Sequence, residues 1–200
     1  MVMKMKKKSR FFATFMLLAI MVVSFAACSG AGGDIISNAD FEKGSGSSIN
    51  GWKLYNYHKD YEGDSSRTKI SLVDMGFDGK CVKIESTGDN DARIYQEISV
   101  DGDAKYKVQF DALYENIDKG ATENGAGLNI SSKKGSQKTG GIYGTVEKWQ
   151  TITAYFTTEE KQESIELTIG IGGYSAESAG TVYIDNVKVE KVKSIPEGES

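Results

Sequence analysis

The sequence predicts an all-β protein, folded as an antiparallel β-sandwich of the jelly-roll type. Short segments alternate apolar and polar side chains, which is the pattern of half-buried strands. Turn signals rich in glycine and polar residues separate these segments, and no stretch has the apolar spacing of an amphipathic helix. An immunoglobulin-like sandwich is the alternative, but it would usually have fewer strands, and the Trp–Cys signature of true immunoglobulin domains is absent.

The N-terminal residues 1–28 are predicted to lie outside this fold. A basic cluster is followed by the apolar run Phe11–Phe25 and then by Ala26, Ala27 and Cys28. This succession resembles a bacterial lipoprotein signal, and the resemblance implies that Cys28 is lipidated. The protein is then expected on the extracellular face of the cell membrane, held only by its lipid. An uncleaved membrane anchor is the alternative. Residues 29–33 are predicted to be a flexible tether.

The charge balance excludes one class of partner. Of the 24 basic residues, five precede Cys28, so removal of the signal leaves 19 basic against 28 acidic residues, a net charge of −9. Binding to nucleic acid rests on basic contacts to phosphate, so no nucleic-acid partner is expected. Cys81 is the only cysteine after Cys28, and in its apolar strand it is expected to be a small buried side chain. We expect a monomer of one domain, over residues 34–193, with a polar tail at 194–200.

The strands follow from the alternation in chain order. The predicted strands are 34–37, 52–58, 69–73, 80–85, 92–100, 106–114, 127–132, 148–157, 164–172 and 182–191. Residues 61–67 and 117–125 are predicted loops, and Asp89–Asp91 is a predicted turn. Across Asp185–Asn186 the inward parity shifts from Val182 and Ile184 to Val187 and Val189, which predicts a β-bulge.

The outward parity of five strands carries the candidate binding residues. They are tyrosines, an arginine, amides and carboxylates: Tyr55, Tyr57, Arg93, Tyr95, Gln109, Asp111, Asn129 and Glu166. The C–H faces of a sugar ring pack on aromatic rings, and its hydroxyls pair with planar amide and carboxylate groups. This set therefore suits an oligosaccharide or polysaccharide. A solvated sheet face with ordinary polar residues is the alternative interpretation.

Asp185 is a candidate metal ligand because it lies inside an apolar strand. A buried carboxylate needs a partner, since burial of a bare charge costs several kcal/mol. A hard cation such as Ca²⁺ would satisfy it with oxygen ligands. A salt bridge or a hydrogen-bonded turn would satisfy it equally well.

Two short motifs resemble a known family. Asn38–Glu42 reads N-A-D-F-E and precedes Gly51-Trp52, and Val182–Val189 reads V-Y-I-D-N-V-K-V. Together they resemble the cellulose- and xylan-binding modules of the family 4/9/22 type, which have a galactose-binding-domain-like jelly roll. The resemblance implies non-catalytic binding of a β-linked polysaccharide in a concave groove, with possible assistance to glycoside hydrolases.

The resemblance also implies particular residues. An aromatic residue soon after Gly51-Trp52 matches Tyr55 or Tyr57, and polar residues on the middle strands match Asn129 and Glu166. One structural Ca²⁺ is implied, held by the side chains of Glu42 and Asp185 and by the backbone of Asp40 and Gly79.

Two other functions remain compatible with the residues of this sequence. A small glycoside hydrolase would use two carboxylates about 5 to 10 Å apart, and Glu97, Asp111 and Glu166 could supply such a pair. An adhesion or envelope-assembly domain could use the same sandwich to bind protein. No G-x-S-x-G, phosphate-binding loop or zinc motif occurs, so we expect no enzyme activity.

Overall fold

The computed structural model describes residues 35–120, 128–131, 141–173 and 176–199, with only the backbone for 128–131. Residues 33–200 form one compact unit. Its elements are β1 (Gly44–Ser45), β2 (Ser48–Ile49), β3 (Lys53–Asn56), α1 (Tyr57–Glu62), β4 (Thr68–Val73), β5 (Cys81–Asn90), β6 (Ala92–Ser99), β7 (Lys105–Glu115), β8 (Leu128–Ser131), β9 (Gln150–Thr157), β10 (Ser164–Ile171) and β11 (Ser178–Val192).

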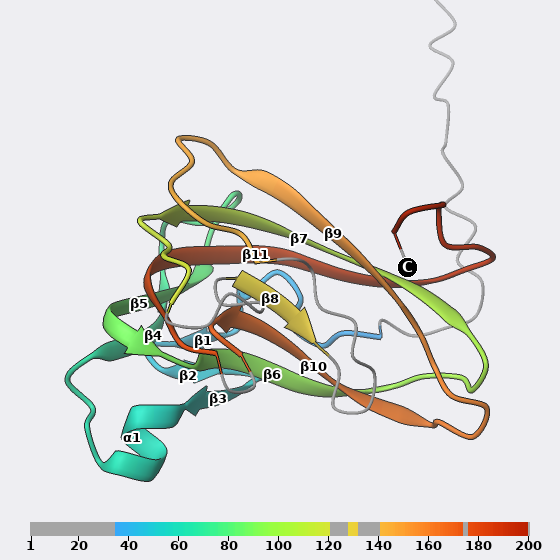
Figure 1. The fold of residues 1–200 in the computed structure, drawn as a ribbon, viewed down its shortest axis with the longest axis horizontal. Coiled ribbons are helices and arrows are strands. Elements are labelled where there is room, and N and C mark those ends of the chain that lie inside the picture. The colour runs from blue at the N-terminus through green and yellow to red at the C-terminus, as the bar shows by residue number, and fades with distance from the viewer. Residues whose placement is uncertain (1–34, 121–127, 132–140, 174–175, 200) are drawn as a thin grey trace, which may run out of the picture. The chain divides into compact units, whose positions relative to one another are not determined.

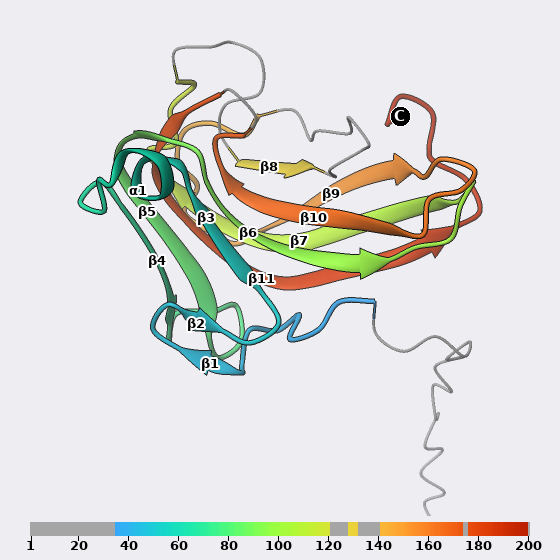
Figure 2. The same cartoon turned by 90° about the horizontal axis from the view of Figure 1, so that it is seen from below.

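The strands form two antiparallel sheets that face each other across one core (Figures 1 and 2). One sheet has four strands in the order β3-β6-β10-β8, and the other has five in the order β4-β5-β11-β7-β9. The pair β1–β2 is a separate small hairpin. The predicted antiparallel β-sandwich is confirmed.

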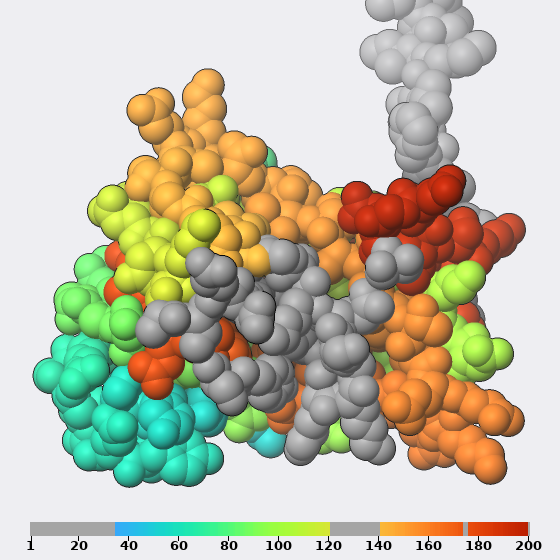
Figure 3. All heavy atoms as spheres, viewed as in Figure 1, coloured from blue at the N-terminus to red at the C-terminus, as the bar shows by residue number. Residues whose placement is uncertain are grey.

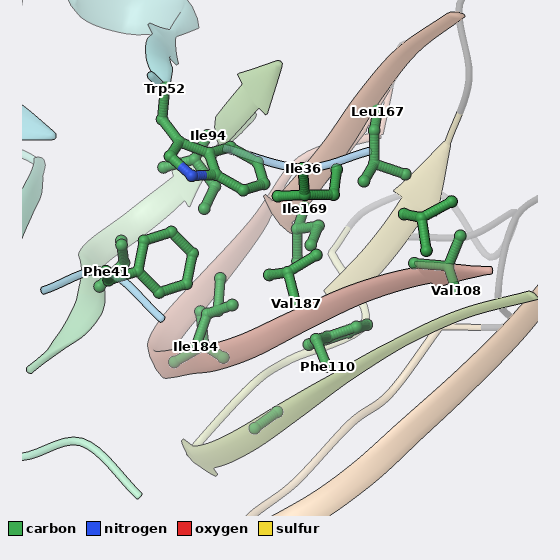
Figure 4. Packing of buried hydrophobic residues seen from close by; sticks show 14 of the residues in the cluster. Ile36, Phe41, Trp52, Ile94, Val108, Phe110, Leu167, Ile169, Ile184 and Val187 are labelled. Carbon is green, nitrogen blue, oxygen red and sulfur yellow. The ribbon is translucent and has the colours of Figure 1, made fainter. Parts of the chain in front are cut away.

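Period-two alternation sets the inner faces, because successive side chains of a strand point to opposite sides. In β7 the even-numbered residues Tyr106 to Tyr114 are buried, whereas Lys107, Gln109, Asp111 and Leu113 are partly exposed. Figure 4 shows the resulting contact between the sheets, with Ile94, Leu167 and Ile169 on one side and Val108, Phe110 and Ile184 on the other.

The N-terminal motif has a structural role. The Asn38 side chain accepts a hydrogen bond from the Lys43 backbone N–H and donates to the carbonyls of Lys43 and Asn50. Trp52 donates from its indole N–H to the Asn38 carbonyl, 3.1 Å away. Its ring lies 5.3 Å from that of Phe41, and both are buried (Figure 4). The motif therefore fixes the segment before β3 against the core.

Two predicted strands near the N-terminus are wrong in part. Ile35–Ser37 is not a strand, and Asn38 and Phe41 have positive φ angles of 50° and 53°, which an extended strand does not allow. The predicted strand 52–58 ends at Asn56, and α1 begins at the next residue, Tyr57. Asn56 caps this helix by accepting a hydrogen bond from the Lys59 N–H. A helix of one to two turns is too short to produce a visible apolar period, so α1 was missed, and the predicted loop 61–67 starts inside it.

The last strand confirms the predicted bulge. The pairing of β11 with β7 shifts between Asp185 and Lys188, and Asn186 has a φ of 50°. Val187 returns to the core and donates its N–H to the Ala39 carbonyl. Both β5 and β11 are longer than the alternation predicts, because they remain paired through an irregularity between Ser178 and Gly180.

Within the described ranges, we find no helix with the length and apolar character needed to span a membrane.

Candidate binding site

A cavity of about 640 Å³ lies on the outer face of the four-stranded sheet, beside α1 and the chain that leads from β10 into β11. Its lining residues are Tyr55, Tyr57, Asp91, Arg93, Tyr95, Glu166, Thr168, Ala176 and Glu177. In the space-filling view, the α1 segment (teal) and the chain around the start of β11 (orange-red) are neighbours (Figure 3), and a contact between His58 and Glu177 joins them. We call this cavity the pocket.

Strand pairing places the floor of the pocket. Tyr55 of β3 is opposite Arg93 of β6, which is opposite Gly170 of β10. The next outward row contains Tyr95 and Thr168, which are also paired. Because the members of each row belong to neighbouring strands, their side chains rise side by side from the sheet.

Arg93 is held rigidly in this floor. Its Nε lies 2.6 Å from Oδ1 of Asp91, and its Nη2 donates to Oδ2 at 2.9 Å. Both residues are only 6% exposed. The guanidinium stacks 4.7 Å from the centre of the Tyr55 ring. A Cβ at Gly170 would come within 2.9 Å of the Arg93 Cγ, so the absence of a side chain there leaves room for the arginine. The paired charge is neutralised within the site.

Three tyrosines make an aromatic wall where β3 meets α1. The Tyr57 ring lies 5.3 Å from the Tyr61 ring, and the Tyr55 ring lies 6.4 Å from the same neighbour. Tyr61 is 71% exposed, whereas the other two are half-buried. Burial, first, and the charge of Asp91 raise the pKa of Tyr55 above its ordinary value. Its hydroxyl is therefore a neutral donor and acceptor at physiological pH.

The structure brings together five of the eight predicted binding residues. They are Tyr55, Tyr57, Arg93, Tyr95 and Glu166, which all line the pocket. Asn129 lies in β8, where its backbone pairs with Gly170 in the same sheet.

Gln109 and Asp111 are a correction to the predicted set. Both lie in β7 of the five-stranded sheet, on the face away from the core, so they cannot share a groove with the pocket residues. Gln109 donates to Thr153 Oγ1, and Asp111 accepts from Thr151 and Asn186. Alternation specifies which residues face outward, but not which of the two sheets a strand joins.

Sequence reasoning missed four residues of the lining. Thr168 shares the outward parity of Glu166, and this signal would have found it. Asp91 was predicted only as part of a turn, although Asn90 ends β5 and Asp91 faces the pocket. Ala176 and Glu177 lie between strands, where alternation gives no direction.

The predicted calcium ligands come from three segments that converge in space. Asp185 is fully buried, and its carboxylate accepts hydrogen bonds from the backbone N–H groups of Phe77, Asp78 and Asn186. Glu42 accepts from the Lys80 N–H at 2.7 Å. Gly79 lies against Glu42, since a Cβ there would come within 2.3 Å of the carboxylate.

These oxygen donors are of the type that Ca²⁺ prefers. However, backbone N–H groups already donate to both carboxylates, as in a hydrogen-bonded turn. Among the described residues, no three His, Cys, Asp or Glu side chains gather closely enough to hold a metal. The donor atoms are therefore of the right kind for a cation, but in this structure they are arranged to accept hydrogen bonds. Burial raises the pKa of Asp185.

Two sequence expectations concern other positions. Cys28 lies outside the described residues. Cys81 is fully buried, as predicted, and burial raises the pKa of its thiol to about 12.

Solved structures of carbohydrate-binding modules share this fold. The protein matches CBM4 with a TM-score of 0.52 and 18% identity, over 78% of this chain and 99% of that chain. TmCBM61, solved in complex with β-1,4-galactotriose, matches with a TM-score of 0.51 and 15% identity, over 80% and 100% of the two chains. The enzymatically active domain of tailspike protein 4 from bacteriophage CBA120 matches with a TM-score of 0.53 and 12% identity, over 80% of this chain but 21% of that one. No protein-family model and no curated protein sequence matches the chain. At these identities, the similarity shows the fold.

Proposed function

We propose that this protein binds a carbohydrate chain in the pocket without cleaving it. The observation that carries the proposal is that tyrosine rings and polar groups line the same cavity. Tyr55, Tyr57 and Tyr95 line it together with Arg93 and Glu166. The shared fold with CBM4 and with TmCBM61, which was solved with a galactotriose, supports the same function.

The chemistry of the pocket matches a neutral sugar. Tyrosine rings offer flat apolar faces for the C–H side of a pyranose. The carboxylate of Glu166 accepts hydrogen bonds from hydroxyls, and the hydroxyl of Thr168 can donate or accept. Arg93 is fixed by Asp91 before any ligand arrives, so little conformational entropy is lost when it binds. We propose a β-linked polysaccharide, of plant or other origin, as the ligand class.

Affinity gel electrophoresis tests this function. The full chain would be run through native gels that contain β-1,4-glucan, xylan, β-1,4-galactan or no polysaccharide. At least one polysaccharide should slow its migration, and Tyr55→Ala should remove that effect. If no polysaccharide slows the protein, carbohydrate binding is overturned and a protein partner, as in adhesion or envelope assembly, becomes the better hypothesis.

A glycoside hydrolase is the second candidate, and one observation favours it. Glu97 and Glu166 are directly paired across β6 and β10, and paired side chains stand about 5 Å apart at Cβ. However, Glu97 is exposed, accepts a hydrogen bond from Ser164 and does not line the pocket. Release of reducing ends from a bound polysaccharide, lost in Glu166→Gln, would establish the enzyme; no release is expected.

We further propose a structural calcium ion at the convergence of Glu42, Gly79 and Asp185, with the backbone of Asp40. The ion would supply positive charge to a buried carboxylate. A ligand that binds only the folded state stabilises it by about 2.7 kcal/mol at a hundredfold excess over Kd. Chelator should therefore lower the melting temperature, and Asp185→Ala should remove this response. An identical melting curve for the wild type with and without chelator, after prolonged dialysis, would contradict the site.

The anchor is a separate proposal that rests on the sequence of residues 1–28. Cys28 would carry the lipid and hold the domain outside the cell membrane. The Cys28→Ala variant should partition into the soluble fraction or retain its signal, whereas Cys81→Ala, the matched control, should stay with membranes. Equal membrane partition of both variants, with the mass of an unmodified chain, would contradict lipidation.

A further inference from the structure

His58, the only histidine of the chain, belongs to α1 and faces the segment that precedes β11, beside the pocket. It is 6% exposed. Nδ1 contacts Oε2 of Glu62 within α1, and Nε2 lies 3.2 Å from Oε2 of Glu177. Glu177 lines the pocket, and so does Tyr57, the residue before His58. The histidine thus joins two parts of one wall.

The two contacts impose a protonation state. An ionised carboxylate only accepts hydrogen bonds, and a neutral imidazole has one N–H donor and one acceptor nitrogen. Both ring nitrogens of His58 face carboxylate oxygens. Only the imidazolium can donate to both at once. After loss of a proton, one nitrogen presents its lone pair to a carboxylate, and that contact becomes repulsive.

The remaining surroundings keep the ring in place. The backbone N–H of His58 donates to the buried Asn90 side chain. The Tyr57 ring meets the imidazole edge-on, with 5.5 Å between the ring centres. On the other side, Gly173 and Ala176 exchange two backbone hydrogen bonds directly before Glu177. The wall is therefore defined on both sides, and the ion pairs of His58 are the contacts that bridge it.

Other charged groups lie on α1 and on the strands beside it. Asp91 is bound to Arg93, and the carboxylate of Asp60 accepts from the Asn56 N–H. Lys59 is exposed on α1, and Glu166 lines the pocket on β10. The hydrogen bond to Glu62, first, and that to Glu177 raise the pKa of His58, against the opposing effect of burial. The imidazolium therefore persists to higher pH than that of an ordinary histidine, whose pKa is about 6.5.

We propose that His58 is a positioning residue that holds the pocket wall only as an imidazolium, so that carbohydrate binding weakens when the ring loses its second N–H. This inference rests on the proposed function and adds its regulation by pH. The neutral ring that keeps its proton on Nδ1 stays bound to Glu62 of its own helix but no longer donates to Glu177. Glu177 is then released from α1, and the wall that presents Tyr57 and Glu177 loosens. The protein would then bind tightly in mildly acidic surroundings and release its ligand as the pH rises.

The first measurement needs no ligand. Because the chain has one histidine, its imidazole signals can be followed by NMR in the full chain, purified in detergent, from about pH 5.5 to about pH 8.5, either side of the ordinary value. We expect a midpoint above 6.5, and the backbone amides of Tyr57 and Glu177 should shift with the same midpoint. A midpoint at or below 6.5, or amides that do not follow the ring, would overturn the positioning role.

The second measurement is calorimetric affinity for xylohexaose, cellohexaose or β-1,4-galactotriose over the same pH range. The wild-type affinity should fall about tenfold, the effect of one charge-assisted hydrogen bond. His58→Gln should bind with the weaker affinity at every pH. Lys59→Gln, a change on the exposed face of the same helix, should keep the wild-type profile.

The possible outcomes separate this inference from the proposed function. A flat wild-type profile with intact binding overturns the pH dependence and leaves carbohydrate binding standing. Failure of all three oligosaccharides to bind at any pH counts against the function, while the NMR midpoint still decides whether His58 positions the wall. If His58→Gln does not fold, the wild-type titrations alone give the answer.

Discussion

The outer faces of the two sheets carry similar types of residue, but these residues make different contacts. Both carry tyrosines, amides and carboxylates at alternate positions. On the four-stranded sheet these side chains line a cavity, and α1 and the segment before β11 form its walls. On the five-stranded sheet they bond to one another, as Asp111 does with Thr151 and Asn186. Polar residues on an outward strand face therefore indicate a site only when another segment stands over them.

The walls differ as well. The turn at residues 75–80 folds against the five-stranded sheet, where the N–H groups of Phe77 and Asp78 donate to the buried Asp185. On the other sheet, α1 is held to the side by Asn56 and Asn90, so a space remains above Arg93. The turn therefore covers Asp185 on the five-stranded sheet, whereas α1 leaves the outer face of the four-stranded sheet open to a ligand.

The largest expected difference between the faces is in stability. Arg93→Met would remove the arginine from a buried ion pair with Asp91, and breaking a buried pair costs about 3–5 kcal/mol. Lys188→Met removes the exposed pair with Glu190 on the five-stranded sheet, and such pairs are worth less than about 1 kcal/mol. Urea unfolding of both variants measures the free energies. Similar losses in the two would contradict the view that burial makes the Asp91–Arg93 pair worth more than the exposed Lys188–Glu190 pair.

A smaller difference is expected in affinity. Tyr55→Ala should weaken carbohydrate binding by about 1–3 kcal/mol, the scale of burying one large side chain. Gln109→Ala and Asp111→Ala should bind as the wild type does, because both residues lie on the opposite sheet. Isothermal titration with the polysaccharide that slows the protein in gels gives the values. Loss of affinity in Asp111→Ala, with unchanged stability, would mean that the binding face has been assigned to the wrong sheet.

A third difference concerns the pH dependence of folding. The raised pKa of His58 means that its contribution to stability is fully present below the unfolded value of about 6.5 and is lost as pH rises through the folded value. The wild type should therefore lose stability relative to His58→Gln as the pH rises above about 6.5. Chemical denaturation at several pH values checks the sign. A constant difference between the two proteins would argue that the ring does not titrate in this range.

The smallest effect is expected at Cys81, under the turn at residues 75–80. Burial, first, and the charge of Asp185 raise the pKa of its thiol to about 12, and thiolate is the reactive form. Iodoacetamide at about pH 8, below the ordinary thiol pKa of about 8.5, should leave Cys81 unmodified in the folded protein and label it after unfolding. Mass spectrometry of the Cys81 peptide reports the result. Rapid labelling in the native state would show that the turn does not close this face.

Much of the candidate site could be predicted from alternation alone. Alternation predicts that Arg93 and Tyr95 on β6 and Glu166 on β10 face outward, because Ile98, Val100 and Leu167 face the core. The same reasoning placed Gln109 outward on β7, which is correct, and in the pocket, which is wrong. The difference arises because parity is a property of one strand, whereas a site needs several strands in one sheet.

The sequence by itself determined the local features: the strand faces, the bulge at Asp185 and the burial of Cys81. Each follows from the period-two geometry of a strand and from the cost of exposing apolar or burying polar groups. The tertiary structure decided which strands are neighbours, where α1 stands, and that His58 meets Glu177 across the pocket wall. These contacts join residues far apart in the chain, and their energies depend on the packing of the whole sandwich. No short window of sequence contains both partners, so only the folded chain could bring them together.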